Sequence, residues 1–160
     1  MNSIILLDTS VLCEWFEVPG KSARGGHRLV TDAMKAYVKD GCDFFLPLAS
    51  VVETGNHIAH VASGNARRRC ANLLAELIEN CITAERPYAT IAYWDEDELK
   101  AIAREFRSNA MSGISMGDTS IIGDFKRLCE GNPTAMRIKI WSMDGHLDAY
   151  EKLSSLTEKE

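Results

Sequence analysis

Short apolar runs alternate with longer amphipathic segments along this chain. Residues 3–7 (Ser-Ile-Ile-Leu-Leu) and 43–46 (Asp-Phe-Phe-Leu) are typical of central parallel strands, which are buried on both faces. Residues 137–142 alternate between polar and apolar positions and predict another strand, and residues 88–91 predict a weak one. The pattern therefore provides up to four candidate strands that are far apart in the sequence.

Between these strands, apolar residues recur every three or four positions, as on the buried face of a helix. The predicted helices cover residues 29–38 (ending at Gly41), 49–62, 65–81, 95–106 and 118–128, and a last short one opens at residues 144–146. Residues 113–117 are predicted as a loop. Strands separated by such helices imply right-handed crossovers. We therefore expect an α/β fold of three layers, with a central parallel sheet of four to five strands flanked by helices.

The length of 160 residues fits one domain, which we predict over residues 1–153, followed by a polar tail at residues 154–160. The chain is 46% hydrophobic and 26% charged, which excludes disordered, collagenous and coiled-coil classes. Its longest apolar runs have five or six residues, too few to span a bilayer. The N-terminus lacks a basic leader. We therefore expect a cytoplasmic protein with no membrane partner.

The cysteines and the net charge limit the kinds of site that this chain is expected to contain. Five cysteines form an odd set without a CxxC pair, so small apolar core residues are favoured over a disulfide framework or a zinc ribbon. The formal net charge of -5 argues against binding of a polyanion by the whole surface. It leaves room for a local basic patch, and it is also expected if several carboxylates gather around a metal.

Four acidic residues follow predicted strands or open predicted helices. Asp8 directly follows the first strand, and Asp144 follows the strand that ends near residue 141. Glu53 lies one to two turns into the helix after the second strand, and Asp118 opens a helix after the 113–117 loop. In a parallel sheet these positions meet near one edge, where ligands bind. Four clustered carboxylates repel one another, and a hard divalent ion, Mg²⁺ or Mn²⁺, would relieve that repulsion.

Each acid also has a purely structural interpretation. Asp8 and Asp144 could serve as helix N-caps, Asp118 as a first-turn acid that complements the helix dipole, and Glu53 as an exposed helix residue. No pair of histidines has a spacing suited to zinc, and His57 and its neighbour three residues later are interpreted as helix-face residues. The common placement of the four acids is what favours a site.

Four segments resemble the motifs of PIN domains, a nuclease family that includes the VapC-type toxins. Residues 5–12 (Ile-Leu-Leu-Asp-Thr-Ser-Val-Leu) are similar to the opening motif, and residues 50–56 (Ser-Val-Val-Glu-Thr-Gly-Asn) to the second acidic motif. Residues 117–122 (Gly-Asp-Thr-Ser-Ile-Ile) resemble the third, and residues 141–144 (Trp-Ser-Met-Asp) the closing one. The motifs occur in the expected order and cover almost the whole chain.

The resemblance implies a Mg²⁺- or Mn²⁺-dependent ribonuclease on a PIN-like fold. It assigns metal binding and catalysis to four acids: Asp8, Glu53, Asp118 and Asp144. Ser10 and Ser142 match hydroxyl positions that orient the ligands or the attacking water. The resemblance also implies that the chain is the toxin of a toxin–antitoxin pair, with RNA as substrate, a cognate antitoxin protein as partner, and homodimerisation.

An acidic site that admits RNA needs positive charge nearby, because phosphate contacts dominate the affinity. Arg67 and Arg68, in the Arg run after Gly64, are the first candidates, followed by Arg24 and Lys21. The same arginines could instead form a solvated helix face. The loop at residues 21–26 and an extra polar turn at residues 130–133 depart from compact PIN toxins.

Three other functions are compatible with parts of this pattern. A deoxyribonuclease or flap-type nuclease would use the same metal chemistry, but the chain is short for a helical arch. A catalytically silent PIN-like module that binds RNA or protein would predict the loss of acids, and all four are present. A phosphoaspartate receiver would need paired acids before Asp8 and a lysine after a late strand, and neither can be assigned. The silent module is therefore the principal alternative.

Overall fold

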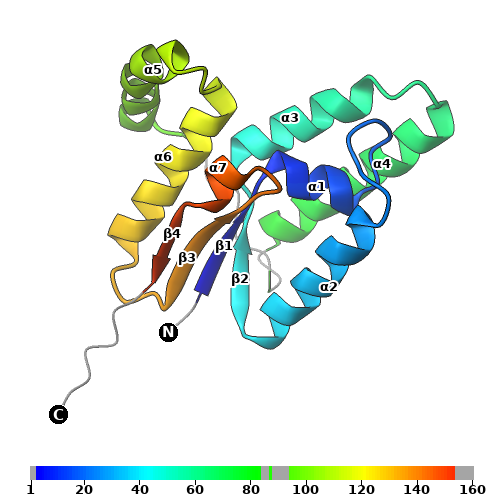
Figure 1. Cartoon of the computed structure of the whole chain (residues 1–160), viewed down its shortest axis with the longest axis horizontal. Helices are drawn as coiled ribbons and strands as arrows, with labels where there is room; N and C mark the ends of the chain where they lie inside the picture. The colour runs from blue at the N-terminus through cyan, green and yellow to red at the C-terminus, as the bar shows by residue number, and fades with distance from the viewer. Residues whose placement is uncertain (1–2, 84–86, 88–93, 154–160) are drawn as a thin grey trace.

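A four-stranded sheet lies at the centre of the computed structural model, which describes residues 3–83, 87 and 94–153 (Figure 1). The strand order is β2-β1-β3-β4. The strands are β1 (Ser3–Leu7), β2 (Cys42–Phe45), β3 (Arg137–Trp141) and β4 (Glu151–Leu153). β1 is parallel to both β2 and β3, whereas β4 is antiparallel to β3. The predicted α/β class is confirmed, and the sheet is mixed but mostly parallel.

The expectation of a wholly parallel sheet is wrong at its β4 edge. A parallel connection needs a crossover of a dozen or more residues. Only residues 142–150 separate β3 from β4, and the helix between them, α7 (Gly145–Asp148), has four residues. The chain therefore turns back beside β3 and pairs in the antiparallel sense, with Arg137 opposite Leu153. The predicted weak strand at residues 88–91 and the predicted tail at 154–160 lie outside the described residues.

Seven helices connect and flank these strands in the described part of the chain. They are α1 (Thr9–Trp15), α2 (Gly26–Lys39), α3 (Leu48–Ala59), α4 (Gly64–Ile82), α5 (Glu96–Met111), α6 (Met116–Gly131) and α7. The predicted loop at residues 113–117 is too long, because α6 begins at Met116 with Ser115 as its N-cap, whose hydroxyl accepts from the Asp118 amide at 3.0 Å. No helix among the described residues is both long and apolar enough to cross a membrane.

Helices cover both faces of the sheet, which explains the continuous apolar run of β1. Ile5 and Leu7 point into one buried cluster, formed with α1, α2, α3 and α4, whereas Leu6 points into a second cluster with α6 and α7. Figure 1 shows α6 on one side of the strands and α2 and α4 on the other. Successive residues of a strand face opposite sides, so a strand covered on both faces needs apolar residues at every position.

The cysteines are part of these clusters. All five are free, four are buried, and Cys129 is half-buried. Burial raises the pKa of the Cys13 and Cys81 thiols to about 11, so both stay protonated at neutral pH. The prediction that the cysteines serve as small apolar residues is confirmed for these positions.

Charged pairs hold α5 against α6. No residue of α5 is fully buried, and Ile102 and Phe106 are half-buried. Arg127 of α6 contacts the carboxylates of Glu98 on α5 and of Asp124, which is 3% exposed. Lys126 pairs with Glu105 at 3.2 Å, and both of these side chains are exposed. Burial raises the pKa of Asp124 to about 7, while the Arg127 guanidinium beside it favours the carboxylate form.

Replacing Arg127 by Met is expected to lower the free energy of unfolding by about 2–4 kcal/mol at pH 8, because it leaves a buried carboxylate without a partner. Burial already raises the folded-state pKa of Asp124 to about 7 with Arg127 in place, and loss of the guanidinium should raise it further above the unfolded value. The contribution of Asp124 to stability is fully present below about pH 4 and is lost as the pH rises through 7. The deficit should therefore be smaller at pH 5 than at pH 8.

Urea unfolding of the variant at the two pH values measures this difference. The matched control is Lys126→Met, which breaks the neighbouring exposed pair and should cost less than about 1 kcal/mol at either pH. Equal decreases in the free energy of unfolding of the two variants would show that burial of the Asp124 carboxylate does not depend on Arg127.

Candidate active site

One cavity brings the four predicted acids together at the carboxyl end of the parallel strands. Its lining includes Asp8 from the β1–α1 junction, Glu53 from α3, Asp118 from α6 and Asp144 from the β3–α7 connection. Its volume of about 260 Å³ is several times the roughly 30 Å³ that one water occupies in the liquid. A second cavity of similar size, between α5 and α6, is lined by Glu98, Asp124 and Arg127, which already pair with one another.

Asp8 is the most firmly held of the four acids. It is buried, and its Oδ2 atom accepts hydrogen bonds from the hydroxyls of Ser10 at 2.7 Å and Ser142 at 2.8 Å. Oδ2 also accepts from the Ser10 amide at 3.3 Å, which makes Asp8 the N-cap of α1. No donor among the described residues reaches Oδ1. Asp8 can therefore act both as an N-cap, through Oδ2, and as a ligand, through Oδ1.

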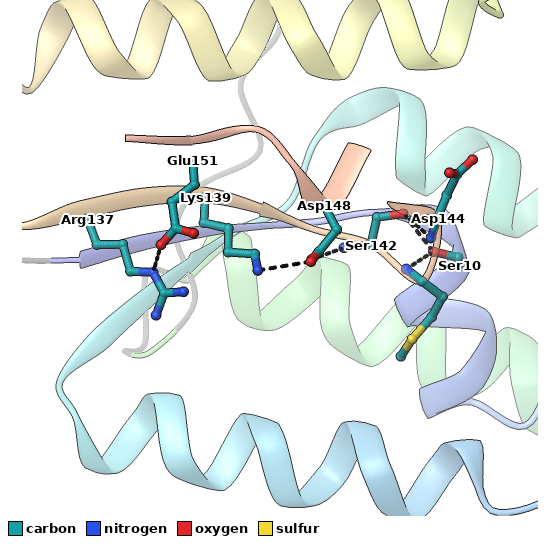
Figure 2. A network of polar contacts seen from close by, with 8 residues as sticks. Ser10, Arg137, Lys139, Ser142, Asp144, Asp148 and Glu151 are labelled. Carbon is teal, nitrogen blue, oxygen red and sulfur yellow. Dashed lines mark hydrogen bonds and ion pairs between the residues drawn. The ribbon is translucent and has the colours of Figure 1, made fainter. Parts of the chain in front are cut away.

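The two serines connect β1 to the β3–α7 segment. Figure 2 shows Ser10 and Ser142 beside one another, with their hydroxyl oxygens 3.2 Å apart. The Ser10 hydroxyl accepts from the Met143 amide and the Ser142 hydroxyl from the Asp144 amide, both at 2.9 Å. Because both hydroxyls also donate to Asp8, they fix the backbone of the closing segment relative to the first strand. Their geometry makes them positioning residues.

Asp144 caps α7, with Oδ1 accepting from the His146 amide at 2.9 Å. The nearby Asp148 has a different role: its carboxylate binds the Lys139 ammonium at 3.1 Å and the Ser142 amide at 3.5 Å (Figure 2). Asp148 therefore supports the segment that carries Ser142 and Asp144. Asp144 itself is exposed at the mouth of the cavity.

Glu53 is positioned by two residues that the sequence analysis did not identify. Its Oε2 atom accepts from the Thr9 hydroxyl at 2.9 Å. Its carboxylate lies directly against the backbone of Gly117, where a Cβ atom would overlap it. A glycine at the start of α6 thus allows Glu53 of α3 to reach the end of the helix that carries Asp118. The only sequence signal was the position of each residue beside a motif acid.

Asp118 lies in the first turn of α6 and is half-buried. Burial raises the pKa of its carboxyl, the charges of Asp8 and Asp144 raise it further, and the hydrogen bond with Ser115 opposes the rise. The three acids are therefore close enough for their charges to repel one another.

The donor set fits a hard divalent cation. All four acids offer carboxylate oxygens, the ligands that Mg²⁺ and Mn²⁺ prefer, and Oδ1 of Asp8 is available. Within the described residues, no three acidic, histidine or cysteine side chains are already close enough together to hold a metal ion.

Of the predicted basic residues, Arg67, Arg68 and Arg24 do not line this cavity, whereas Lys21 does. Arg67 and Arg68 are exposed on α4, and Arg24 is exposed on the loop after α1. Arg69 binds the carbonyls of Phe16 at 2.9 Å and Glu17 at 3.1 Å, so its role is to hold the end of α1. Lys21, which the sequence also proposed, shares the cavity wall with His57, which lies one helical turn beyond Glu53.

Replacing Asp118 by Asn is expected to raise the melting temperature of the metal-free protein by about 1–3 °C at pH 8, because it removes a carboxylate whose charge is disfavoured by burial and by repulsion from Asp8 and Asp144. The folded-state pKa of Asp118 is raised, so its unfavourable contribution appears as the pH rises through that value and is absent below the unfolded pKa. Thermal unfolding in EDTA at pH 4 and pH 8 checks this. A lower melting temperature at pH 8 would contradict the repulsion.

Comparison with known proteins gives no match: no protein-family model matches the chain, and no curated protein is similar to it. The case for a function therefore rests on the geometry of this cavity and on the four motifs that supply its acids.

Proposed function

We propose that this protein is a Mg²⁺- or Mn²⁺-dependent ribonuclease with a three-layer, PIN-like fold. One observation carries the proposal: four carboxylates from four separate segments line one cavity at the carboxyl end of the parallel strands. Carboxylates that lie close together repel one another, and in α/β proteins such unfavourable clusters are typical of ligand-binding sites. The order of the four motifs along the chain supports the same function.

Asp8, Glu53 and Asp118 would hold the cation, with Asp144 completing the set from the cavity mouth. When bound, the ion lowers the pKa of water and offsets negative charge on a phosphodiester. The chain itself supplies the positioning. Ser10 and Ser142 hold one oxygen of Asp8, and Thr9 holds one oxygen of Glu53, so that each carboxylate presents its other oxygen in a defined direction.

The hydrogen bonds also favour direct hydrolysis over covalent catalysis. The hydroxyl of Ser10 donates to Asp8 and accepts from the Met143 amide, and that of Ser142 donates to Asp8 and accepts from the Asp144 amide. Neither is available as a nucleophile. In the reaction that we propose, a water oxygen attacks phosphorus and gives up one proton to solvent, the bond from phosphorus to the leaving ribose oxygen breaks, and that oxygen takes up one proton from solvent, so that one water is consumed for each bond broken.

A cleavage assay tests the proposal. Purified protein is incubated with total RNA and with single-stranded DNA in Mg²⁺, in Mn²⁺ and in EDTA. We expect RNA cleavage in either metal and none in EDTA, with fragment ends that identify the broken bond. A folded protein that leaves RNA intact in both metals would instead indicate the catalytically silent PIN-like module, which binds RNA or a protein without cleaving.

The proposal extends to a role as the toxin of a toxin–antitoxin pair and to a homodimer, in the cytoplasm. A toxin of this kind should arrest bacterial growth on induced expression and be relieved by the protein encoded beside it. Light scattering of the purified chain measures the homodimer. Normal growth on expression of an active enzyme would favour a housekeeping ribonuclease.

A further inference from the structure

Lys21 brings a positive charge into the cavity of the four acids. It is the one lysine or arginine among the residues that line this cavity. It lies on the loop between α1 and α2, which departs from compact PIN toxins, and it shares the cavity wall with His57 of α3. In Figure 1 this loop rises from the end of α1 towards the side of the fold that carries α3 and α4.

The ammonium of Lys21 is available to an external anion. Although four carboxylates line the same cavity, none of the described carboxylates lies within 4.0 Å of the Lys21 nitrogen as an ion pair. Its charge lies near Cys13, whose thiol pKa is raised by burial and only partly lowered by Lys21, and near His57, whose imidazole pKa is lowered by burial and by Lys21. The Lys21 ammonium therefore lies at the cavity without an ion pair to a described carboxylate.

The backbone of the loop holds Lys21 in place. The Lys21 amide donates to the carbonyl of Val18 at 3.0 Å, and the Ser22 hydroxyl donates to the same carbonyl at 3.1 Å. The Val18 side chain is fully buried, and Arg69 binds the carbonyl of Glu17 just before it. Because these contacts fix the backbone of the loop, they also limit the positions that the exposed Lys21 side chain can take over the cavity.

We propose that Lys21 is the phosphate-binding residue of this site, whose ammonium contacts a non-bridging oxygen of the phosphodiester that enters between it and the carboxylates. Four carboxylates outweigh the charge of a single divalent cation, so an anionic substrate needs a further positive group inside the cavity. Lysine meets this need as a point charge, without the fixed geometry of a guanidinium. The inference rests on the proposed nuclease function.

The test compares Lys21→Gln with Lys21→Arg and with Lys35→Gln in the cleavage of a fluorescent single-stranded RNA oligonucleotide in Mn²⁺. Lys35 is an exposed lysine of α2, so its replacement removes the same charge away from the cavity. We expect Lys21→Gln to raise KM about tenfold and to reduce the salt dependence of kcat/KM by about one phosphate contact. Lys21→Arg should restore most of the affinity, and Lys35→Gln should leave both quantities unchanged.

The outcomes separate the two proposals. Wild-type cleavage with a KM for Lys21→Gln within twofold of that for Lys35→Gln would overturn the role of Lys21 and leave the nuclease intact. Absence of metal-dependent cleavage by the wild type would overturn both. Melting temperatures equal to that of the wild type in all three variants exclude a folding defect, as expected for exposed side chains.

Discussion

Asp8→Asn is expected to reduce kcat/KM for RNA cleavage by at least about 10³-fold, a loss of roughly 4 kcal/mol of transition-state stabilisation. The amide keeps the shape of the carboxylate and an oxygen that can still accept from Ser10 and Ser142. It removes the negative charge that would attract a cation to the buried centre of the site. The fold should therefore survive while cation binding fails.

Two measurements check this result. Calorimetric titration with Mn²⁺ should show weaker binding by Asp8→Asn than by the wild type, independently of any activity. The matched control is Asp32→Asn, which removes an exposed carboxylate paired with Arg28 and Lys35 on α2. It should leave binding and cleavage unchanged. Undiminished cleavage by Asp8→Asn would exclude this cavity as the active site.

Gly117→Ala is expected to lower kcat by about 100-fold without weakening the fold, because a small displacement of a catalytic group has an effect of that size. The added Cβ would occupy the space of the Glu53 carboxylate. That carboxylate ends a flexible side chain, so it moves aside and loses its hydrogen bond from Thr9. Alanine also favours a helix over glycine by roughly 0.5–1 kcal/mol, so the melting temperature should hold or rise.

Gly123→Ala provides the matched control on the same helix. A Cβ at Gly123 would meet only an Ile102 side-chain carbon at 3.9 Å, an ordinary contact. Thermal unfolding and cleavage kinetics are measured on both variants. We expect both to keep or gain stability, and only Gly117→Ala to lose activity. Full activity in Gly117→Ala would mean that the position of Glu53 against α6 does not matter for the reaction.

Local chemistry let the sequence predict most of the elements. The apolar run of β1 identifies a strand covered on both faces, and Asp8 and Ser10 form the N-cap of α1 within three residues. The start of α5 is equally local, since Asp95 and Glu98 satisfy each other's amides in a capping box. Such interactions are encoded within one turn of helix, and the sequence shows both partners side by side.

The convergence of the acids was also within reach of the sequence. In a parallel sheet the carboxyl ends of the strands share one edge. The convergence of residues that follow different strands can therefore be predicted from the order of strands and helices, before the packing is known. Asp8 and Asp144 lie at this edge, and Glu53 and Asp118 line the same cavity. The geometry that fixes each side chain was not predictable, because it depends on partners such as Ser142 for Asp8 and Thr9 for Glu53.

The sequence by itself thus determined the α/β class, the helix caps at Asp8 and Asp144 and the edge of the sheet where the acids gather, because these depend on periodicity and on neighbours along the chain. Only the tertiary structure decided the antiparallel β4, the approach of Glu53 to Gly117 and the presence of Lys21 in the cavity. Each of these depends on distances between segments that are remote in sequence. Packing sets those distances, and no local pattern encodes them.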